Sequence, residues 1–145
     1  MPTLKDDTVM NYVVIDTNVI VSALLATNPT ASNPFSIVKA AFMGRVKPVL
    51  SEAIMKEYRE VLTRKKFGFN KEKIDIFLSE LKSQSVFINP PKLQVVLPDA
   101  KDLCFYEAAM VYENVGGLLV TGNIRHFPGC DFAVTPSQLK EKMLL

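Results

Sequence analysis

The sequence is short of cysteine, histidine and long apolar runs, and each shortage narrows what the protein can do. It has only two cysteines, Cys104 and Cys130, and their spacing is not that of paired metal ligands. Free thiols in a reducing cytoplasm are therefore the best interpretation. The one histidine, His126, is interpreted as a loop or packing residue rather than a catalyst. No apolar run approaches the roughly 18 residues of a membrane-spanning helix, so we expect a cytoplasmic protein without a membrane anchor.

A large excess of charge of one sign is also missing. The 17 Lys and Arg residues nearly balance the 15 Asp and Glu residues, which leaves a formal net charge of +2. This balance does not indicate a strong polyanion binder, and it permits nucleic-acid binding only through a local basic patch. The densest local cluster is Arg64, Lys65 and Lys66, for which solvated surface is the ordinary explanation.

Length and apolar content favour a single domain. The chain has 145 residues, and 48% of them are hydrophobic, which is enough for one core. The first nine residues, MPTLKDDTV, are polar and acidic and do not resemble a signal peptide. We interpret residues 1–9 as a loose leader that adds nothing to the fold, and residues 10–145 as the domain.

Strand-like and helix-like segments alternate along the chain, which is typical of an α/β fold with a mostly parallel sheet. Short apolar segments predict strands at 12–15, 47–50, 85–88, 118–121 and 132–134. Helical periodicity predicts helices at 19–25, 35–43, 51–65, 70–82, 99–112 and from 135 onwards. Ser51, Asn70 and Thr135 are predicted helix N-caps, and Gln138 completes a capping box with Thr135.

Polar side chains interrupt the apolar pattern where two of the predicted strands end. Asp16 follows the first strand, in the run YVVIDTNVIVSALL, and Asn123 follows the fourth. Asp102 lies in the first turn of the helix that leads into the fourth strand. Glu57 lies at the border of the apolar stripe of the 51–65 helix. Ligands of parallel sheets bind beyond the carboxyl ends of the strands, so these four side chains could converge on one site.

Carboxylates gathered in one cleft favour a hard divalent cation. They repel each other and raise each other's pKa values unless a cation neutralises them. Oxygen ligands without cysteine or histidine select ions such as Mg²⁺ or Mn²⁺. Each residue also has an ordinary structural explanation. Asp16, Asp99 and Asp102 could be helix caps, Glu57 a solvated flank and Asn123 a turn residue.

Four segments carry a set of motifs in a fixed order. They are VVIDTNVIVSALL, LSEAIMKEYREVLTRKKF, PDAKDLCFYEAAMV and LLVTGNIRHFP, with VTPSQL closing the chain. This ordered set, from Met10 to about Leu139, resembles the PIN domain family, specifically the branch of toxin components similar to VapC-type ribonucleases. The resemblance implies a three-layer α/β/α sandwich around a mostly parallel five-stranded sheet. It also implies a metal-dependent nuclease.

The resemblance assigns roles to individual residues. Asp16 matches the first acidic ligand of the family, Glu57 the helical glutamate and Asp102 the aspartate at a helix start. Asp99 resembles an accessory acid. The fourth acidic position is Asn123, in TGN where many members read TGD, so the predicted site has one formal negative charge fewer and should bind a second metal ion less well. Polar residues that resemble braces of the site are Thr17, Asn18 and Thr121.

The function implied by the resemblance is that of a Mg²⁺- or Mn²⁺-dependent endoribonuclease, in which water activated at the metal attacks an RNA phosphodiester. The family branch also implies a toxin held in check by a cognate antitoxin protein. We expect a homodimer, because the helices predicted at 51–65 and 70–82 lie where PIN-like proteins often pair. Candidate contacts to RNA phosphates are Arg64, Lys65, Lys66 and Arg125.

Two other classes of function remain open. One is a PIN-fold RNA-binding or scaffold protein whose site has decayed, which Asn123 favours and the retention of three acids opposes. The other is a phosphatase of the haloacid dehalogenase type, which also places an aspartate after its first strand. That chemistry needs a second aspartate two residues later, where this chain has Asn18, so we rank it below the others.

Overall fold

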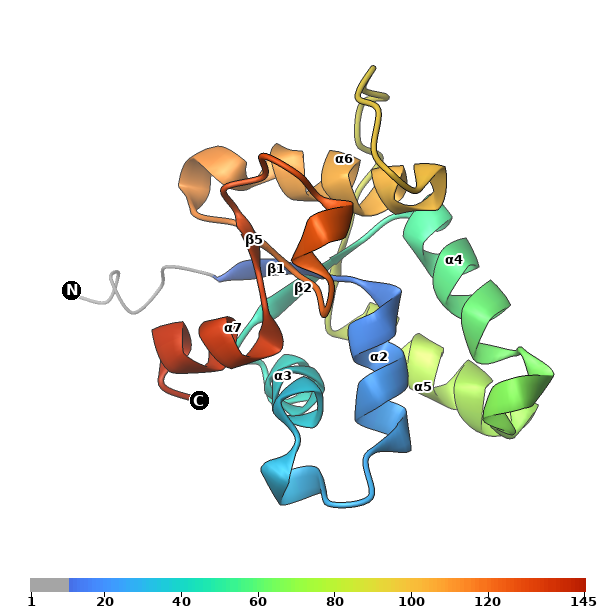
Figure 1. Cartoon of the computed structure of the whole chain (residues 1–145). Coiled ribbons are helices and arrows are strands. Elements are labelled where there is room, and N and C mark those ends of the chain that lie inside the picture. Colours follow the sequence, from blue (N-terminus) through green and yellow to red (C-terminus); the bar gives the residue numbers. More distant parts are fainter. Residues whose placement is uncertain (1–10) are drawn as a thin grey trace.

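A five-stranded parallel sheet forms the centre of the structure, a computed structural model that describes residues 11–145 (Figure 1). The strand order is β3-β2-β1-β4-β5, and all four strand pairs are parallel. The predicted α/β fold with a mostly parallel sheet is confirmed. The predicted leader, residues 1–9, lies outside the described residues. The strands are β1 (Tyr12–Ile15), β2 (Lys47–Leu50), β3 (Val86–Phe87), β4 (Leu118–Val120) and β5 (Ala133–Val134).

The central strand β1 is apolar on both of its faces. Val13, Val14 and Ile15 are each 1% exposed, as expected for a parallel strand that helices cover on both sides. β1 pairs with β2 on one side and with β4 on the other, where Ile15 lies opposite Val120. This register places the residues that follow β1 and β4 next to each other at one edge of the sheet.

Helices cover both faces of the sheet, which gives the expected three layers (Figure 1). α6 lies over one face and contacts β1, β2 and β4, whereas α3 and α7 pack together on the opposite face. α4 packs against α2, α5 and α6. The helices are α2 (Thr17–Leu25), α3 (Asn33–Phe42), α4 (Glu52–Leu62), α5 (Lys71–Ser83), α6 (Leu103–Val111) and α7 (Pro136–Met143). Short 3₁₀ turns are η1 (Pro29–Ala31), η2 (Lys65–Phe67), η3 (Ala100–Asp102), η4 (Glu113–Val115) and η5 (Ile124–His126).

The predicted helix caps are confirmed. The Ser51 hydroxyl accepts a hydrogen bond from the Ile54 amide at 3.2 Å, and α4 begins at the next residue. The Asn70 side chain caps α5 in the same way. Thr135 and Gln138 exchange the two hydrogen bonds of a capping box at the start of α7. These residues satisfy amide groups that have no partner inside the helix.

Three predicted helix starts were wrong. α3 begins at Asn33, two residues earlier than the predicted start, because Ser32 caps it through the Phe35 amide. α2 begins at Thr17, two residues earlier than the predicted start, because the chain turns directly out of β1 at Asp16. The segment predicted as one helix from 99 to 112 starts as the 3₁₀ turn η3 and becomes α6 only at Leu103. The cause is local, since the Asp99 side chain accepts a hydrogen bond from the Lys101 amide and tightens the first turn.

Within residues 11–145, none of the helices combines the length and the apolar character needed to cross a membrane.

Candidate active site

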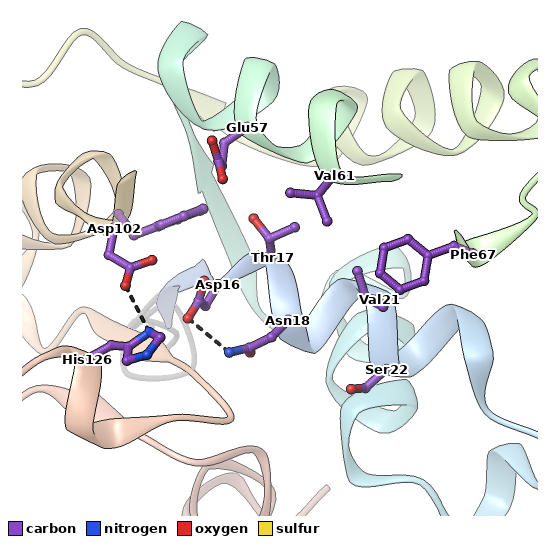
Figure 2. Close-up of a pocket in the computed structure, with 11 residues that line it drawn as sticks. Asp16, Thr17, Asn18, Val21, Ser22, Glu57, Val61, Phe67, Asp102 and His126 are labelled. Carbon is purple, nitrogen blue, oxygen red and sulfur yellow. Dashed lines mark hydrogen bonds and ion pairs between the residues drawn. The ribbon is translucent and has the colours of Figure 1, made fainter. Parts of the chain in front are cut away.

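A cavity of about 280 Å³ opens at the carboxyl end of β1, between α2, α4 and α6 (Figure 2). Asp16, Glu57 and Asp102, the three acids predicted to share a site, all line it. The structure therefore brings together side chains from three separate parts of the chain. Their roles as metal ligands and catalytic groups stay predictions. The remaining lining residues are Thr17, Asn18, Val21, Ser22, Val61, Phe67, Phe105 and His126.

Asp16 is held by hydrogen bonds to its side chain rather than used as a helix cap. It directly precedes α2, but its carboxylate makes no capping hydrogen bond. Instead, its Oδ2 atom accepts hydrogen bonds from the Thr121 hydroxyl at 2.7 Å and from the Asn18 amide at 3.3 Å. The Asp16 amide donates to the Val120 carbonyl at 2.9 Å. The carboxylate is thus fixed in the cavity wall at 4% exposure. Asp16 occupies the N-cap position of α2, but its side chain does not act as a cap.

Asn18 connects the loop after β4 to the start of α2. Its Oδ1 atom accepts a hydrogen bond from the Gly122 amide at 3.0 Å, while its amide group donates to Asp16. A Cβ atom at Gly122 would lie 3.3 Å from this Oδ1 atom. Only glycine allows this approach without a shift of the neighbouring side chain. Asn18, Gly122 and Thr121 together set the position of the Asp16 carboxylate.

Glu57 reaches the cavity because α4 is tied to the end of β1. The buried Tyr58, next to Glu57, donates a hydrogen bond from its hydroxyl to the Ile15 carbonyl. Ile54, Tyr58 and Leu62 form the buried stripe of α4. Glu57 lies at the border of that stripe, as the sequence predicts, and points into the cavity (Figure 2). The solvated-flank interpretation of Glu57 is therefore incomplete.

Asp102 ends the 3₁₀ turn η3 and is 8% exposed. Its Oδ2 atom lies 3.0 Å from Nδ1 of His126, an ion-pair contact when the imidazole is protonated (Figure 2). This buried oxygen makes no aligned hydrogen bond within residues 11–145, and neither does the buried hydroxyl of Thr17. Asp102 makes no side-chain cap to α6 either. Within residues 11–145, the buried Thr17 hydroxyl in the cavity wall therefore has no partner, whereas Asp102 Oδ2 contacts only His126.

His126 was not predicted to contribute to this site. It ends the turn η5 after β4, lines the cavity and contacts Asp102. Its interpretation as a simple loop or packing residue is too limited. A signal was present in the sequence, since His126 follows the motif TGN at the end of the fourth strand by three residues.

The electrostatics of the cavity favour a bound cation. Burial raises the pKa of Asp16, and the hydrogen bond from Thr121 partly opposes this change. Burial and the nearby charge of Glu60 raise the pKa of Glu57. Burial and the negative charges of Asp16 and Asp99 raise the pKa of Asp102 to about 6. A group of carboxylates with raised pKa values gains stability from a positive charge.

Asp99 and Asn123 do not line the cavity. Asp99 is exposed, and its carboxylate caps η3 through the Lys101 amide. Its charge nevertheless contributes to raising the pKa values of the three cavity acids. Asn123 precedes η5, and its backbone amide donates a hydrogen bond to the Thr121 hydroxyl at 3.0 Å. In this structure Asn123 therefore acts as a turn residue, which is one of the two interpretations open from the sequence.

The donor set suits a hard divalent cation, although the ligands are not already gathered around one point. Asp16, Glu57 and Asp102 supply only oxygen atoms, and the Thr17 hydroxyl, which has no partner within residues 11–145, lies in the same wall. Within residues 11–145, no three Asp, Glu, His or Cys side chains are close enough together to hold an ion. Binding would therefore require side-chain rotation in the cavity.

The predicted RNA-contacting residues lie in exposed turns beside the cavity. Lys65 and Lys66 form η2 together with Phe67, which lines the cavity. Arg64 precedes this turn, and its positive charge opposes the rise in the pKa of Glu57. Arg125 lies in η5 next to His126. All four basic residues are exposed, and their contact with RNA stays a prediction.

The apolar part of the cavity wall was also missed. Val21, Val61 and Phe67 line one end of the cavity. Val61 lies four residues after Glu57, and Val21 four residues after Thr17, so helical periodicity could have placed both valines beside the predicted site. Phe67 lies in a 3₁₀ turn outside any periodic pattern, and no signal in the sequence identified it.

A parallel five-stranded sheet between helical layers, with three carboxylates lining one cavity at the end of its central strand, defines an α/β protein with an acidic cavity. Comparison with protein families identifies the family to which this α/β protein belongs. The family model described as "PIN domain" matches residues 12–125, and the chain belongs to this family. PIN domains are generally nucleases that use divalent metal ions.

Comparison with solved structures supports the fold. The structure of PAE2754 from Pyrobaculum aerophilum matches with a TM-score of 0.60 and 17% sequence identity. The match covers 94% of this chain and 97% of that one. At this identity the likeness concerns the fold alone. A comparison with curated proteins found no match.

Proposed function

We propose that the protein is a Mg²⁺- or Mn²⁺-dependent endoribonuclease that cleaves RNA phosphodiesters. The observation that carries this proposal is the position of Asp16, Glu57 and Asp102 in one cavity at the carboxyl end of β1. The chain belongs to the PIN domain family, and the resemblance of its sequence motifs assigns the family's metal-ligand positions to these three buried or half-buried acids.

Each residue of the site then has a distinct task. Asp16, Glu57 and Asp102 would hold the cation, and Thr121 and Asn18 keep Asp16 in place for it. When bound, the cation supplies Lewis-acid activation of the phosphodiester and of water. His126 contacts Asp102 and so orients the carboxylate that has fewest other contacts. The exposed basic residues around the cavity would bind the RNA backbone.

The biological setting is part of the same proposal. The resemblance to toxin components supports an RNA-cleaving toxin that a cognate antitoxin protein inhibits by covering the cavity. We place the protein in the cytoplasm, where the free cysteines Cys104 and Cys130 would remain reduced. A homodimer through the region of α4 and α5 is proposed, and light scattering that finds only monomer at high micromolar concentration would exclude it.

One further function is supported by a specific observation. The three acids are not gathered closely enough to hold an ion in this structure, and position 123 is neutral. Both facts favour a catalytically weakened PIN-fold protein that binds RNA without cutting it. The cavity and its three carboxylates favour the enzyme, and metal binding distinguishes the two functions.

The decisive experiment measures metal binding and RNA cleavage together. Mn²⁺ at about 100 times its dissociation constant should stabilise the parent protein by about 2.7 kcal/mol, which thermal unfolding detects. Asp16→Asn, which keeps volume and removes one ligand charge, should abolish both this stabilisation and cleavage of single-stranded RNA. Asp131→Asn, at an exposed position, is the matched control and should leave both intact. If Asp16→Asn binds Mn²⁺ as tightly as the parent does, the shared metal site is wrong.

A further inference from the structure

The cavity has two ends of different chemistry (Figure 2). The carboxylates of Asp16, Glu57 and Asp102 lie at one end, and the side chains of Val21, Val61 and Phe67 lie at the other. The proposed chemistry at a phosphodiester uses only the acidic end. The apolar end therefore needs a different explanation, and it points to a part of the substrate that is not phosphate.

Two helices run from the acidic end to the apolar end. On α4, Glu57 and Val61 are four residues apart, so they lie one above the other on the same helix face. On α2, Thr17 and Val21 have the same spacing. Both valines are half-buried and line the cavity. The apolar wall thus lies about one helical turn, roughly 5–6 Å, from the acidic wall, within the dimensions of one nucleotide.

Phe67 closes the apolar end and is held in place by its own neighbours. The rings of Phe67 and Phe69 stack with their centroids 5.7 Å apart and their planes 18° apart. Gly68, between them, has a positive φ of 66° that reverses the chain at the end of η2. A side chain at this position would be strained, so glycine allows the pairing. The half-buried aromatic ring is therefore presented to the cavity in a fixed position.

A lysine amine lies over this aromatic ring. The Lys66 Nζ atom lies 5.1 Å from the centroid of the Phe67 ring, and Arg64 and Lys65 directly precede it in the chain. An aromatic face next to cations is the combination that proteins use for single-stranded nucleic acids, where bases stack on rings and phosphates meet Lys and Arg. A paired base is already stacked inside its duplex and cannot reach such a face.

We propose that Val21, Val61 and Phe67 form a subsite for one unpaired nucleobase beside the phosphodiester that is cleaved. This inference rests on the proposed nuclease function and adds to it a contact for one base of the single-stranded substrate. The cavity volume of about 280 Å³ lies just below the roughly 300 Å³ at the lower end of drug-sized ligand sites. Besides the Thr17 hydroxyl next to the acidic end, the cavity lining offers one hydroxyl, that of Ser22, so we expect the subsite to accept different bases with little preference.

The test compares two ligands of equal charge. One is an oligouridylate of about eight nucleotides, within the usual site sizes for single strands, and the other is an abasic ribose-phosphate oligomer of the same length. Fluorescence anisotropy gives the dissociation constant of each for the parent, for Phe67→Ala and for Phe67→Tyr. Phe87→Ala is the matched control, because Phe87 is an exposed phenylalanine on the edge strand β3, outside the cavity.

The parent should bind the oligouridylate more tightly than the abasic oligomer. Phe67→Ala should weaken binding of the oligouridylate by roughly 5- to 100-fold, the range for losing one stacked base, and leave binding of the abasic oligomer unchanged. The salt dependence should also stay unchanged, because no phosphate contact is removed. Phe67→Tyr, which keeps the ring, should restore binding, and Phe87→Ala should behave like the parent.

Failure of this inference is distinguishable from failure of the proposed nuclease function. The base subsite is overturned if the parent binds both oligomers equally or binds neither, or if Phe67→Ala binds the oligouridylate as tightly as the parent does. This holds whether or not the protein binds Mn²⁺. If base discrimination holds but Mn²⁺ does not stabilise the protein, the subsite stands and the metal-dependent enzyme is overturned. Phe67→Ala itself should retain the Mn²⁺-induced rise in melting temperature, since it removes no carboxylate.

Discussion

Replacing Asp102 by asparagine should stabilise the metal-free protein while removing its response to metal. Asp102 is 8% exposed, and its pKa is raised from 3.8 to about 6 by burial and by the charges of Asp16 and Asp99. The folded state therefore holds the proton more tightly than the unfolded chain does. Asparagine has nearly the same volume and carries no charge, so it removes the cost of keeping a carboxylate in this place.

The size of the effect follows from the change in pKa. A difference between 3.8 and about 6 corresponds to about 2–3 kcal/mol, since each pKa unit is worth about 1.4 kcal/mol. The penalty is absent only well below pH 3.8, where Asp102 is protonated in both states. It grows as the pH rises toward 6 and is complete above that value. The melting temperature of Asp102→Asn should exceed that of the parent by about 6–9 °C at pH 8. The difference should shrink as the pH falls through about 6 and disappear at pH values well below 3.8.

Thermal unfolding of both proteins from about pH 3 to pH 8, with a chelator present, measures this difference. Asp131→Asn is again the control, because Asp131 is exposed and its replacement should change the melting temperature little. In a second series with Mn²⁺, the parent should have the higher melting temperature, since the ion stabilises the parent and not Asp102→Asn. The reasoning is refuted if Asp102→Asn is no more stable than the parent at pH 8, or if the gain in stability is the same at every pH.

Two further predictions follow from contacts in and around the cavity. Thr121→Val removes the hydrogen bond to Asp16 and should destabilise the protein by about 1.5–3 kcal/mol, the usual worth of a bond to a charged group. Thr63→Val removes an exposed hydroxyl and should have a smaller effect in the same thermal unfolding assay; equal losses would contradict the special role of Thr121. Charge removal in the basic turns should reduce the slope of log affinity for RNA against log salt by roughly 3, because each phosphate that is no longer neutralised lowers the slope by about 0.7. Binding measured across a salt series checks this, and an unchanged slope would place the RNA elsewhere. The four residues to replace together are Arg64, Lys65, Lys66 and Arg125.

Features encoded by neighbouring residues were predictable from the sequence. The caps at Ser51 and Asn70 depend on an amide three residues away, so the residue types alone identify them. The parallel sheet follows from the alternation of apolar strands and amphipathic helices. Asp16 stood out because a carboxylate followed three buried strand residues.

Features set by contacts distant in sequence were harder to predict. The side chains of Asp16 and Thr121 meet only because β1 and β4 are neighbours in this register. The contact between His126 and Asp102 depends on the turn η5, whose position the sequence does not specify locally. Phe67 reaches the cavity from a 3₁₀ turn, where neither helical nor strand periodicity applies. Motif resemblance identified the acids, but it gave no information about the apolar wall.

The structure also changes the significance of the asparagine at position 123. The resemblance interprets Asn123 as a missing fourth acidic ligand, which would weaken the site. In this structure Asn123 does not line the cavity, and neither does Asp99, yet the charge of Asp99 helps to raise the pKa values of Asp16 and Asp102. In the metal-free protein, an aspartate at position 123 would add another negative charge near Asp16 and Asp102. The neutral side chain avoids that repulsion and keeps all three acids of the cavity, so asparagine at this position is compatible with a working metal site.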